Sequence, residues 1–410
     1  MGKKLVSQAL WILLMLAVLT ACGGNERSVL NVTGNGGEFI KYDDAIYYRE
    51  DRADTYASSG IWDWFERQPG APVRVMRLNA DGTSEPVFDD TGYGGMYLYE
   101  DADGELRFLL NAYVIEEGDG YTAYVPEIYS VNRSGGDRID FGEGYIVALD
   151  EARSLIVAAT YRGGIVAFNL HTQEATLLAE AYLRPEHYDP GQSVLYCQSG
   201  ENYSEDSVFT LTAIDMESGA EAVVLDLSQD NFYDLTGNDY FGDYYEVQNL
   251  WKDGDSVFVY VAGYGGSAYM YYDSVLLEVD GQGVYRAIAL PSARDWYGPD
   301  NVYSLDADGA FYENGVGYEV FVEGADEPLK VLAAKDLLGI GIIERPEFGM
   351  DGFTSIKPLA WLGSDFFFSV TTGTRNENED IGWRNGYDRQ GTSVYWKEMN
   401  SGEIQLLYSY

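Results

Sequence analysis

Short β-strand patterns separated by tight turns recur along almost the whole chain of 410 residues. The stretch 249–290 shows the unit most clearly. It contains an apolar run, an Asp-Gly turn at 253–254, a β-branched run at 256–262, a long loop rich in glycine and tyrosine, and two further strands joined at 280–283. Asp-Gly between alternating apolar residues is a strong hairpin signal, so each unit is expected to form four antiparallel strands.

Seven variants of this unit fill residues 38–410, at about 53 residues each. Four-stranded repeats of this length are typical of β-propellers, because a ring of sheets buries each face against a neighbour and leaves only short edges. The sequence therefore predicts an all-β fold, a β-propeller with seven four-stranded blades. Six or eight blades are alternatives, since the fourth unit and the connection 333–353 are ambiguous. A pair of β-sandwiches is the alternative fold.

The repeat of strand, Asp-Gly turn and strand resembles the YWTD-like and TolB-like propellers of bacteria. The resemblance covers nearly the whole mature chain, although no unit carries a complete Tyr-Trp-Thr-Asp tetrapeptide. It implies the fold and transfers no functional residue, because propellers serve binding, scaffolding and catalysis alike.

The N-terminal residues form a targeting segment. Lys3 and Lys4 precede an apolar run at 9–19, which is too short to span a bilayer comfortably. The run ends in Leu-Thr-Ala followed by Cys22, which resembles the lipobox of bacterial lipoproteins. The resemblance implies that Cys22 becomes the first mature residue and carries the lipid. An ordinary secretory signal with a chance cysteine is the alternative.

These features divide the chain into a lipoprotein signal peptide at 1–21, a lipidated N-terminus and flexible tether at 22–37, and the propeller at 38–410. We expect a membrane-anchored lipoprotein on the extracytoplasmic side, at the cell surface or in the periplasm. The lipid would be its only attachment to the membrane.

The net charge limits which molecules can bind the chain, and the cysteine content limits its disulfides. The chain carries 67 Asp and Glu against 26 Lys and Arg, a net charge of −41. Such a field repels nucleic acid and anionic headgroups, so neither is expected as a partner. With Cys22 lipidated, Cys197 has no disulfide partner, and its strand pattern predicts a buried small hydrophobe.

Long insertions gather on one face of the predicted ring. If the strands of a unit are labelled A to D outward from the axis, the A–B and C–D turns are nearly all tight. The insertions occupy the B–C and D–A loops, among them 113–126, 263–273 and 372–391. Tyr and Trp beside carboxylates suit stacking on sugar rings or recognition of a protein, although any one of them could simply pack its loop onto the ring. The candidate ligand-binding residues are Trp62, Trp64, Tyr121, Tyr264, Tyr269, Tyr271, Trp296, Trp383 and Tyr387.

Evidence for catalysis or for a metal is weak. The two histidines, His171 and His187, argue against a histidine-based triad or a zinc site. Acidic turns such as 101–105 could offer oxygens to Ca²⁺, but Asp-Gly turns contain these residues anyway. A denser acidic cluster is formed by Asp230, Asp234, Asp239, Asp243 and Glu246. We therefore expect no catalytic residue, no metal ligand and no cofactor, with Ca²⁺ left open.

The sequence favours a binding module. The expected protein is a monomeric, lipid-anchored propeller whose long-loop face captures a glycan or an envelope or surface protein. One alternative is a hydrolase or lyase that acts on a polysaccharide through carboxylates and tyrosines of that face. The other is a scaffold for envelope assembly.

Overall fold

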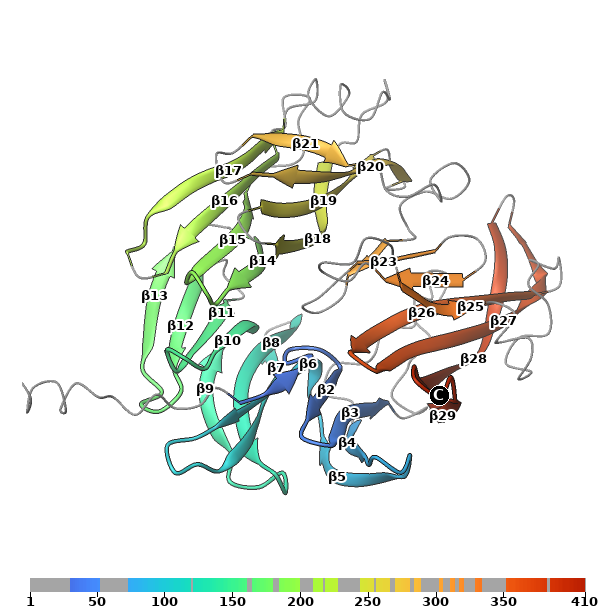
Figure 1. Cartoon of the computed structure of the whole chain (residues 1–410), viewed down its shortest axis with the longest axis horizontal. Coiled ribbons are helices and arrows are strands. Elements are labelled where there is room, and N and C mark those ends of the chain that lie inside the picture. The colour runs from blue at the N-terminus through green and yellow to red at the C-terminus, as the bar shows by residue number, and fades with distance from the viewer. Residues whose placement is uncertain are drawn as a thin grey trace, which may run out of the picture.

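A computed structural model gives the fold of the chain. It describes residues 30–51, 73–118, 121–160, 164–179, 184–199, 209–216, 218–227, 244–253, 256–265, 270–280, 284–288, 302–304, 310–313, 317–320, 329–333, 352–381 and 384–409. These residues form seven antiparallel sheets, which Figure 1 shows arranged in a ring. The all-β propeller prediction is confirmed. The number of blades stays a prediction.

The first four sheets contain the strands up to residue 227. The first has five strands, β1 (Val32–Thr33), β2 (Phe39–Tyr42), β3 (Ala45–Asp51), β4 (Val73–Leu78) and β5 (Ser84–Asp90). The second has β6 (Tyr93–Glu100), β7 (Leu106–Gly118), β8 (Tyr121–Asn132) and β9 (Ile139–Glu143). The third has β10 (Tyr145–Asp150), β11 (Leu155–Ala159), β12 (Ile165–Asn169) and β13 (Ala175–Ala179). The fourth has β14 (Arg184–Asp189), β15 (Val194–Ser199), β16 (Phe209–Asp215) and β17 (Glu221–Leu227).

The last three sheets repeat the same order. The fifth has β18 (Tyr244–Asp253), β19 (Ser256–Gly265), β20 (Met270–Val279) and β21 (Tyr285–Ile288). The sixth has β22 (Val302–Ser304), β23 (Ala310–Glu313), β24 (Gly317–Val320) and β25 (Leu329–Ala333). The seventh has β26 (Gly352–Leu362), β27 (Asp365–Ile381), β28 (Arg384–Glu398) and β29 (Ile404–Ser409). Within every sheet the strands follow chain order, as successive hairpins require.

The core consists of layers between neighbouring sheets. One buried cluster joins Tyr188 of the fourth sheet to Val157 and Ile165 of the third. Another joins Leu225 of the fourth sheet to Val259 of the fifth. The fourth sheet is therefore stabilised by apolar side chains on both of its faces, as closure of a ring requires.

The first and last sheets meet at a seam made of side chains. The rings of Phe39 and Phe367 stack with their centroids 4.1 Å apart. Lys41 Nζ lies 2.6 Å from Asp365 Oδ2, and Gln405 donates to the Gly82 carbonyl at 2.8 Å. In the described ranges, no strand from one end of the chain enters the sheet at the other end. Closure at the seam therefore rests on packing and on these polar contacts.

Residues 30–37, here called the strap, are bound to the ring although the sequence pattern assigned them to the tether. Val32 and Thr33 pair with Tyr42 and Lys41 on the inner edge of the first sheet. The Gly36 amide donates to the Met96 carbonyl at 2.7 Å, and the Met96 amide donates to the Gly37 carbonyl at 2.9 Å. The strap thus satisfies backbone groups of two neighbouring inner strands, which would otherwise depend on water.

Three stretches that the pattern assigned to loops are largely paired strands. Residues 113–126 continue the β7–β8 ladder as far as the Gly118–Tyr121 pair. Residues 263–273 and 372–391 likewise continue β19–β20 and β27–β28. Tyrosine, valine and threonine at 113–125 are strong strand formers, so the ladder continues beyond the body of the sheet.

Cys197 on β15 is fully buried and free, as the sequence predicted. Burial raises the pKa of its thiol to about 12 from an ordinary value of 9.0. In a Cys22→Ser variant, where Cys197 is the remaining thiol, we expect reaction with an aromatic disulfide reagent to be about 1000-fold slower in the native state than in denaturant. Stopped-flow absorbance measures both rates, and a fast native reaction would contradict the burial.

Candidate binding face

The two faces of the ring are built differently. The plain face carries the turns that join β2 to β3, β6 to β7 and the equivalent strands of the other sheets. The opposite side, here called the hairpin face, is where β7–β8, β19–β20 and β27–β28 turn. On the β7–β8 hairpin the longer strand has 13 residues, against 5 in the equivalent β11, so it extends eight residues farther. At about 3.3 Å per residue, this is roughly 26 Å of additional strand.

Side-chain caps close the turns of the plain face. Asp101 Oδ1 accepts the amides of Asp103 and Glu105, each at 3.0 Å. Asn132 Oδ1 accepts the amides of Ser134 and Gly136, also at 3.0 Å. In the acidic turn considered for Ca²⁺, the Asp101 carboxylate therefore accepts hydrogen bonds from the turn's own backbone, as Asp in a tight turn commonly does.

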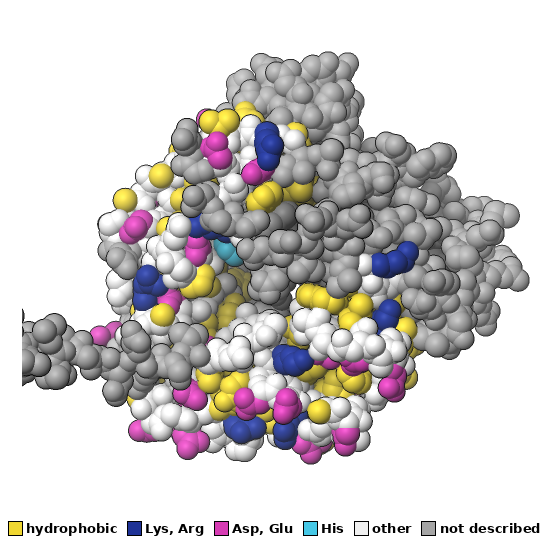
Figure 2. All heavy atoms as spheres, viewed as in Figure 1, with side chains coloured by type: hydrophobic (Ala, Val, Ile, Leu, Met, Phe, Trp, Pro, Cys, Tyr) yellow, Lys and Arg dark blue, Asp and Glu magenta, His cyan; other side chains and the backbone are white. Residues whose placement is uncertain are grey.

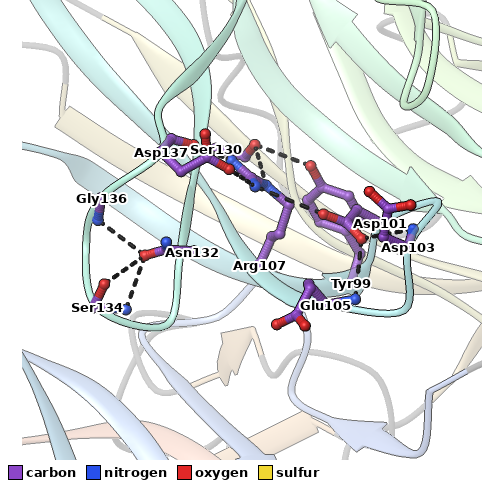
Figure 3. A network of polar contacts seen from close by, with 10 residues as sticks. All are labelled: Tyr99, Asp101, Asp103, Glu105, Arg107, Ser130, Asn132, Ser134, Gly136 and Asp137. Carbon is purple, nitrogen blue, oxygen red and sulfur yellow. Dashed lines mark hydrogen bonds and ion pairs between the residues drawn. The ribbon is translucent and has the colours of Figure 1, made fainter.

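A buried arginine joins these two turns, as Figure 3 shows. The Arg107 side chain is 2% exposed and its Nη1 lies 2.8 Å from Asp137 Oδ2. Its Nε donates to Ser130 Oγ at 3.2 Å, and the same Oγ accepts from the Tyr99 hydroxyl at 2.9 Å. Arg107 Nη1 also lies 3.7 Å from Asp101 Oδ2. This network therefore holds the β6–β7 and β8–β9 turns together.

A second polar network lies between the first two sheets, beneath the hairpin face. Arg49 Nη2 lies 3.3 Å from Asp90 Oδ2, and both side chains are 5% exposed. Arg49 also donates to the Gly94 carbonyl, and the Tyr129 hydroxyl donates to Asp90 Oδ1. Burial and the charge of Asp90 raise the pKa of Tyr129, so the phenol stays protonated and remains a donor. The network positions the base of the β7–β8 hairpin, and within the described residues it leaves the buried Arg49 Nε without a hydrogen-bond partner.

Aromatic contact continues from this base toward the third sheet. Tyr113 of β7 and Tyr145 of β10 meet edge to face with their centroids 6.5 Å apart. Asn111 donates to the carbonyls of Glu127 and Gly144 at 3.1 Å and 2.9 Å. These contacts fix where the long hairpin leaves the ring. The sequence pattern does not distinguish Asn111, Arg49 or Asp90, because buried polar residues in a strand have the same pattern as exposed ones.

The candidate ligand-binding residues fall into two groups. Trp62, Trp64, Tyr269, Trp296 and Trp383 lie outside the described residues. Tyr121, Tyr264, Tyr271 and Tyr387 lie on the long hairpins, where Tyr264 is in register with both Tyr244 and Tyr271, and Tyr387 with Arg375. The backbone thus brings Tyr264 and Tyr271 together, and the binding role of all nine residues stays a prediction.

The acidic cluster of residues 230–246 also lies mainly outside the described ranges, since of its members only Glu246 belongs to a described strand, β18. Within the described ranges, no group of three or more His, Cys, Asp or Glu is placed to hold a metal. In those same ranges, no helix is long and apolar enough to cross a membrane. On the coloured part of the face in Figure 2, acidic and basic side chains are interspersed.

His187 on β14 lies beside Tyr196, with ring centroids 6.2 Å apart. Burial lowers the pKa of its imidazole below the ordinary value of 6.5; Lys252 adds to this and Asp189 opposes it. The unfolded chain therefore binds a proton at higher pH than the fold does, so the free energy of unfolding decreases as the pH falls below about 6.5.

We expect a His187→Gln variant to lose stability less steeply than the wild type between about pH 7 and pH 5. Urea unfolding at several pH values measures the slope. His171→Gln is the matched control, because His171 occupies an exposed plain-face turn between β12 and β13, where its Nε2 lies 3.1 Å from Ser154 Oγ. Equal slopes for the wild type and the His187 variant would show that this histidine does not control the pH dependence.

No protein-family model and no curated protein matches the chain. Among solved structures, the acylaminoacyl peptidase of Pyrococcus horikoshii is 12% identical with a TM-score of 0.40; the match covers 77% of this chain and 52% of the peptidase, so this chain spans about half of its length. The propeller domain of the trilobed protease from Pyrococcus furiosus is 12% identical, with a TM-score of 0.37 and coverage of 77% and 98%. BamB from Moraxella catarrhalis is 10% identical, with a TM-score of 0.36 and coverage of 87% and 97%. Likeness at this level says nothing about activity.

Proposed function

We propose that the protein is a lipid-anchored, extracytoplasmic propeller that acts as a binding module and captures a glycan or protein partner through its hairpin face. The lipid at Cys22 would hold it at the membrane. The supporting observation is the difference between the two faces. Capped, tight turns close one face, while paired hairpins extend from the other and carry four of the nine candidate aromatic residues.

Paired hairpins suit binding better than catalysis. A ladder of backbone hydrogen bonds holds each hairpin extended, so a partner meets a surface that loses little conformational entropy on binding. Catalysis would need a matched acid and base, and the titratable networks described here, around Arg107 and around Arg49, are used internally.

A glycan array probed with the mature protein, with and without Ca²⁺, is the test. A specific signal that is lost in Trp383→Ala or Trp62→Ala, and kept in the plain-face variant Ala102→Ser, would establish a carbohydrate receptor. A silent array followed by specific cross-linking to one envelope protein through β7–β8 would establish a protein receptor. The proposal would be contradicted if the array stays silent and no specific cross-link forms, or if cross-links form only through the plain face.

The anchor has its own test. We expect wild-type protein to fractionate with membranes and Cys22→Ala to be released, because one modified cysteine carries the whole attachment. Retention of the alanine variant in the membrane fraction would show that the lipobox interpretation is wrong.

A further inference from the structure

The chain enters the ring from the plain face, and its entry point is fixed. The Leu30 amide donates to Glu151 Oε2 at 3.0 Å, and Glu151 belongs to the plain-face turn between β10 and β11. Leu30 and Val32 pack against the apolar cluster between the first two sheets. Burial and nearby Glu100 raise the pKa of Glu151, while the Leu30 amide opposes this, as expected for a carboxylate covered by the strap.

From Leu30 the strap runs toward the hairpin face along the inner edges of two sheets. Thr33 pairs with Lys41, and Asn35 donates to the Leu98 carbonyl at 3.1 Å and accepts the Leu98 amide at 2.7 Å. Figure 1 shows this part of the chain, in blue, near the centre of the ring. The strap then turns back into β2. The strap therefore covers the inner edges of β2 and β6.

The chain between Cys22 and Leu30 is short. Eight residues of fully extended chain reach at most about 28 Å. To pass from the plain-face entry point around the rim, the chain would cross four strands spaced about 4.8 Å apart and then the height of a sheet, which together amount to roughly 40 Å. An anchor at Cys22 therefore cannot reach the hairpin side around the rim of the ring while Leu30 stays in place.

We infer that the plain face is turned toward the lipid bilayer and the hairpin face away from it, with the entry point at most about 28 Å from the lipid. The inference rests on the proposed lipid attachment at Cys22. It makes the bilayer the neighbour of the plain face and leaves the long hairpins to meet partners outside.

The negative charge of the plain face is consistent with a ring that is tethered near the bilayer and does not adsorb directly onto its headgroups. Its turns carry exposed acids, including Asp43, Asp81, Asp103, Glu174 and Glu403. Anionic headgroups repel such a surface within about a Debye length. The strap thus holds the ring near the bilayer while the turns keep it from lying on the headgroups.

Energy transfer from a dye on the protein to headgroup-labelled lipid tests the orientation. Full-length protein would be reconstituted into vesicles after dye attachment at one introduced cysteine, either Ala102→Cys in the plain-face β6–β7 turn or Val114→Cys on the β7 hairpin. Both positions are exposed and belong to one sheet. Because Cys197 is buried and Cys22 is blocked by lipid, the introduced thiol is the reactive one.

We expect the transfer efficiency at position 102 to be at least about twofold higher than at position 114. About 26 Å of strand lies between the two positions, so position 114 would be farther from the labelled headgroups. Equal efficiencies, or a higher value at 114, would overturn the inference. Flotation of the vesicles shows whether the protein is anchored at all, so a wrong orientation can be distinguished from failure of the lipid anchor. If wild-type protein does not float, a histidine tag replacing residues 1–22 removes the unlipidated Cys22 thiol, nickel-chelating lipid places the N-terminus at the bilayer, and the same two positions are compared.

Discussion

Replacing Gly95 by alanine is expected to reduce the free energy of unfolding by about 3 kcal/mol or more. A Cβ at this position would lie 1.6 Å from the Gly36 carbonyl oxygen, which is backbone and cannot rotate away. The strap must therefore leave β6 and lose the two Gly36–Gly37 hydrogen bonds with Met96 and both bonds between Asn35 and Leu98. At about 1 kcal/mol for each bond, the loss reaches the expected value.

Gly94→Ala is the matched control for Gly95→Ala. Gly94 has a φ of +70°, but a Cβ there would meet no atom within 4 Å. Its cost is limited to backbone strain of about 1–2 kcal/mol. Urea unfolding gives both values, and limited proteolysis reports whether the strap is released. If the two variants are equally stable, and the strap remains protected in both, the close approach of Gly95 and Gly36 does not exist in solution.

Replacing Asp90 by alanine is expected to cost about 3–5 kcal/mol. Asp90 and Arg49 are both almost completely buried, so removing the carboxylate leaves a guanidinium in a poorly solvated place. The Tyr129 hydroxyl loses its acceptor at the same time. Removing both charges should restore part of the loss, since Arg49→Met added to Asp90→Ala leaves no uncompensated ion.

Asp89→Ala is the neighbouring control. Asp89 pairs with Arg74 at 2.8 Å, but its side chain is 64% exposed. Exposed pairs contribute about 0–1 kcal/mol, so the two adjacent aspartates should differ severalfold in cost. Urea unfolding of the three variants provides the comparison. Similar costs for Asp89→Ala and Asp90→Ala would mean that solvent reaches the Arg49–Asp90 pair.

The strands and the turns of the ring follow from local sequence. Asp-Gly and Asn-containing turns between β-branched runs predicted the hairpins, and the pattern around Cys197 predicted its burial. β14 belongs to the unit that the sequence pattern left ambiguous, and it pairs with β15 despite Pro185, with a shift of one residue in the pairing between Pro185 and His187. Local sequence was sufficient to predict the structure wherever a strand pairs with its neighbour in the chain.

The strap and the buried ion pair could not be predicted in the same way. Residues 30–37 are polar and glycine-rich, as a tether is, and their binding depends on β6, more than 50 residues farther along the chain. Arg49 and Asp90 have the composition of a solvated edge, and their burial follows only once two sheets pack together. For the hairpin face, the sequence identified the extended hairpins as insertions but not their strand pairing.

The seam has a consequence for how a bound partner affects the ring. Neighbouring sheets elsewhere follow one another in the chain, whereas the first and last sheets belong to its two ends and meet through contacts such as Phe39 with Phe367 and Lys41 with Asp365. The ring can therefore widen at this place without breaking any strand pairing. A partner that spans the seam would act as a clamp and would stabilise the whole molecule, because opening the ring would require its release. A partner of equal affinity on a single sheet would leave that motion free.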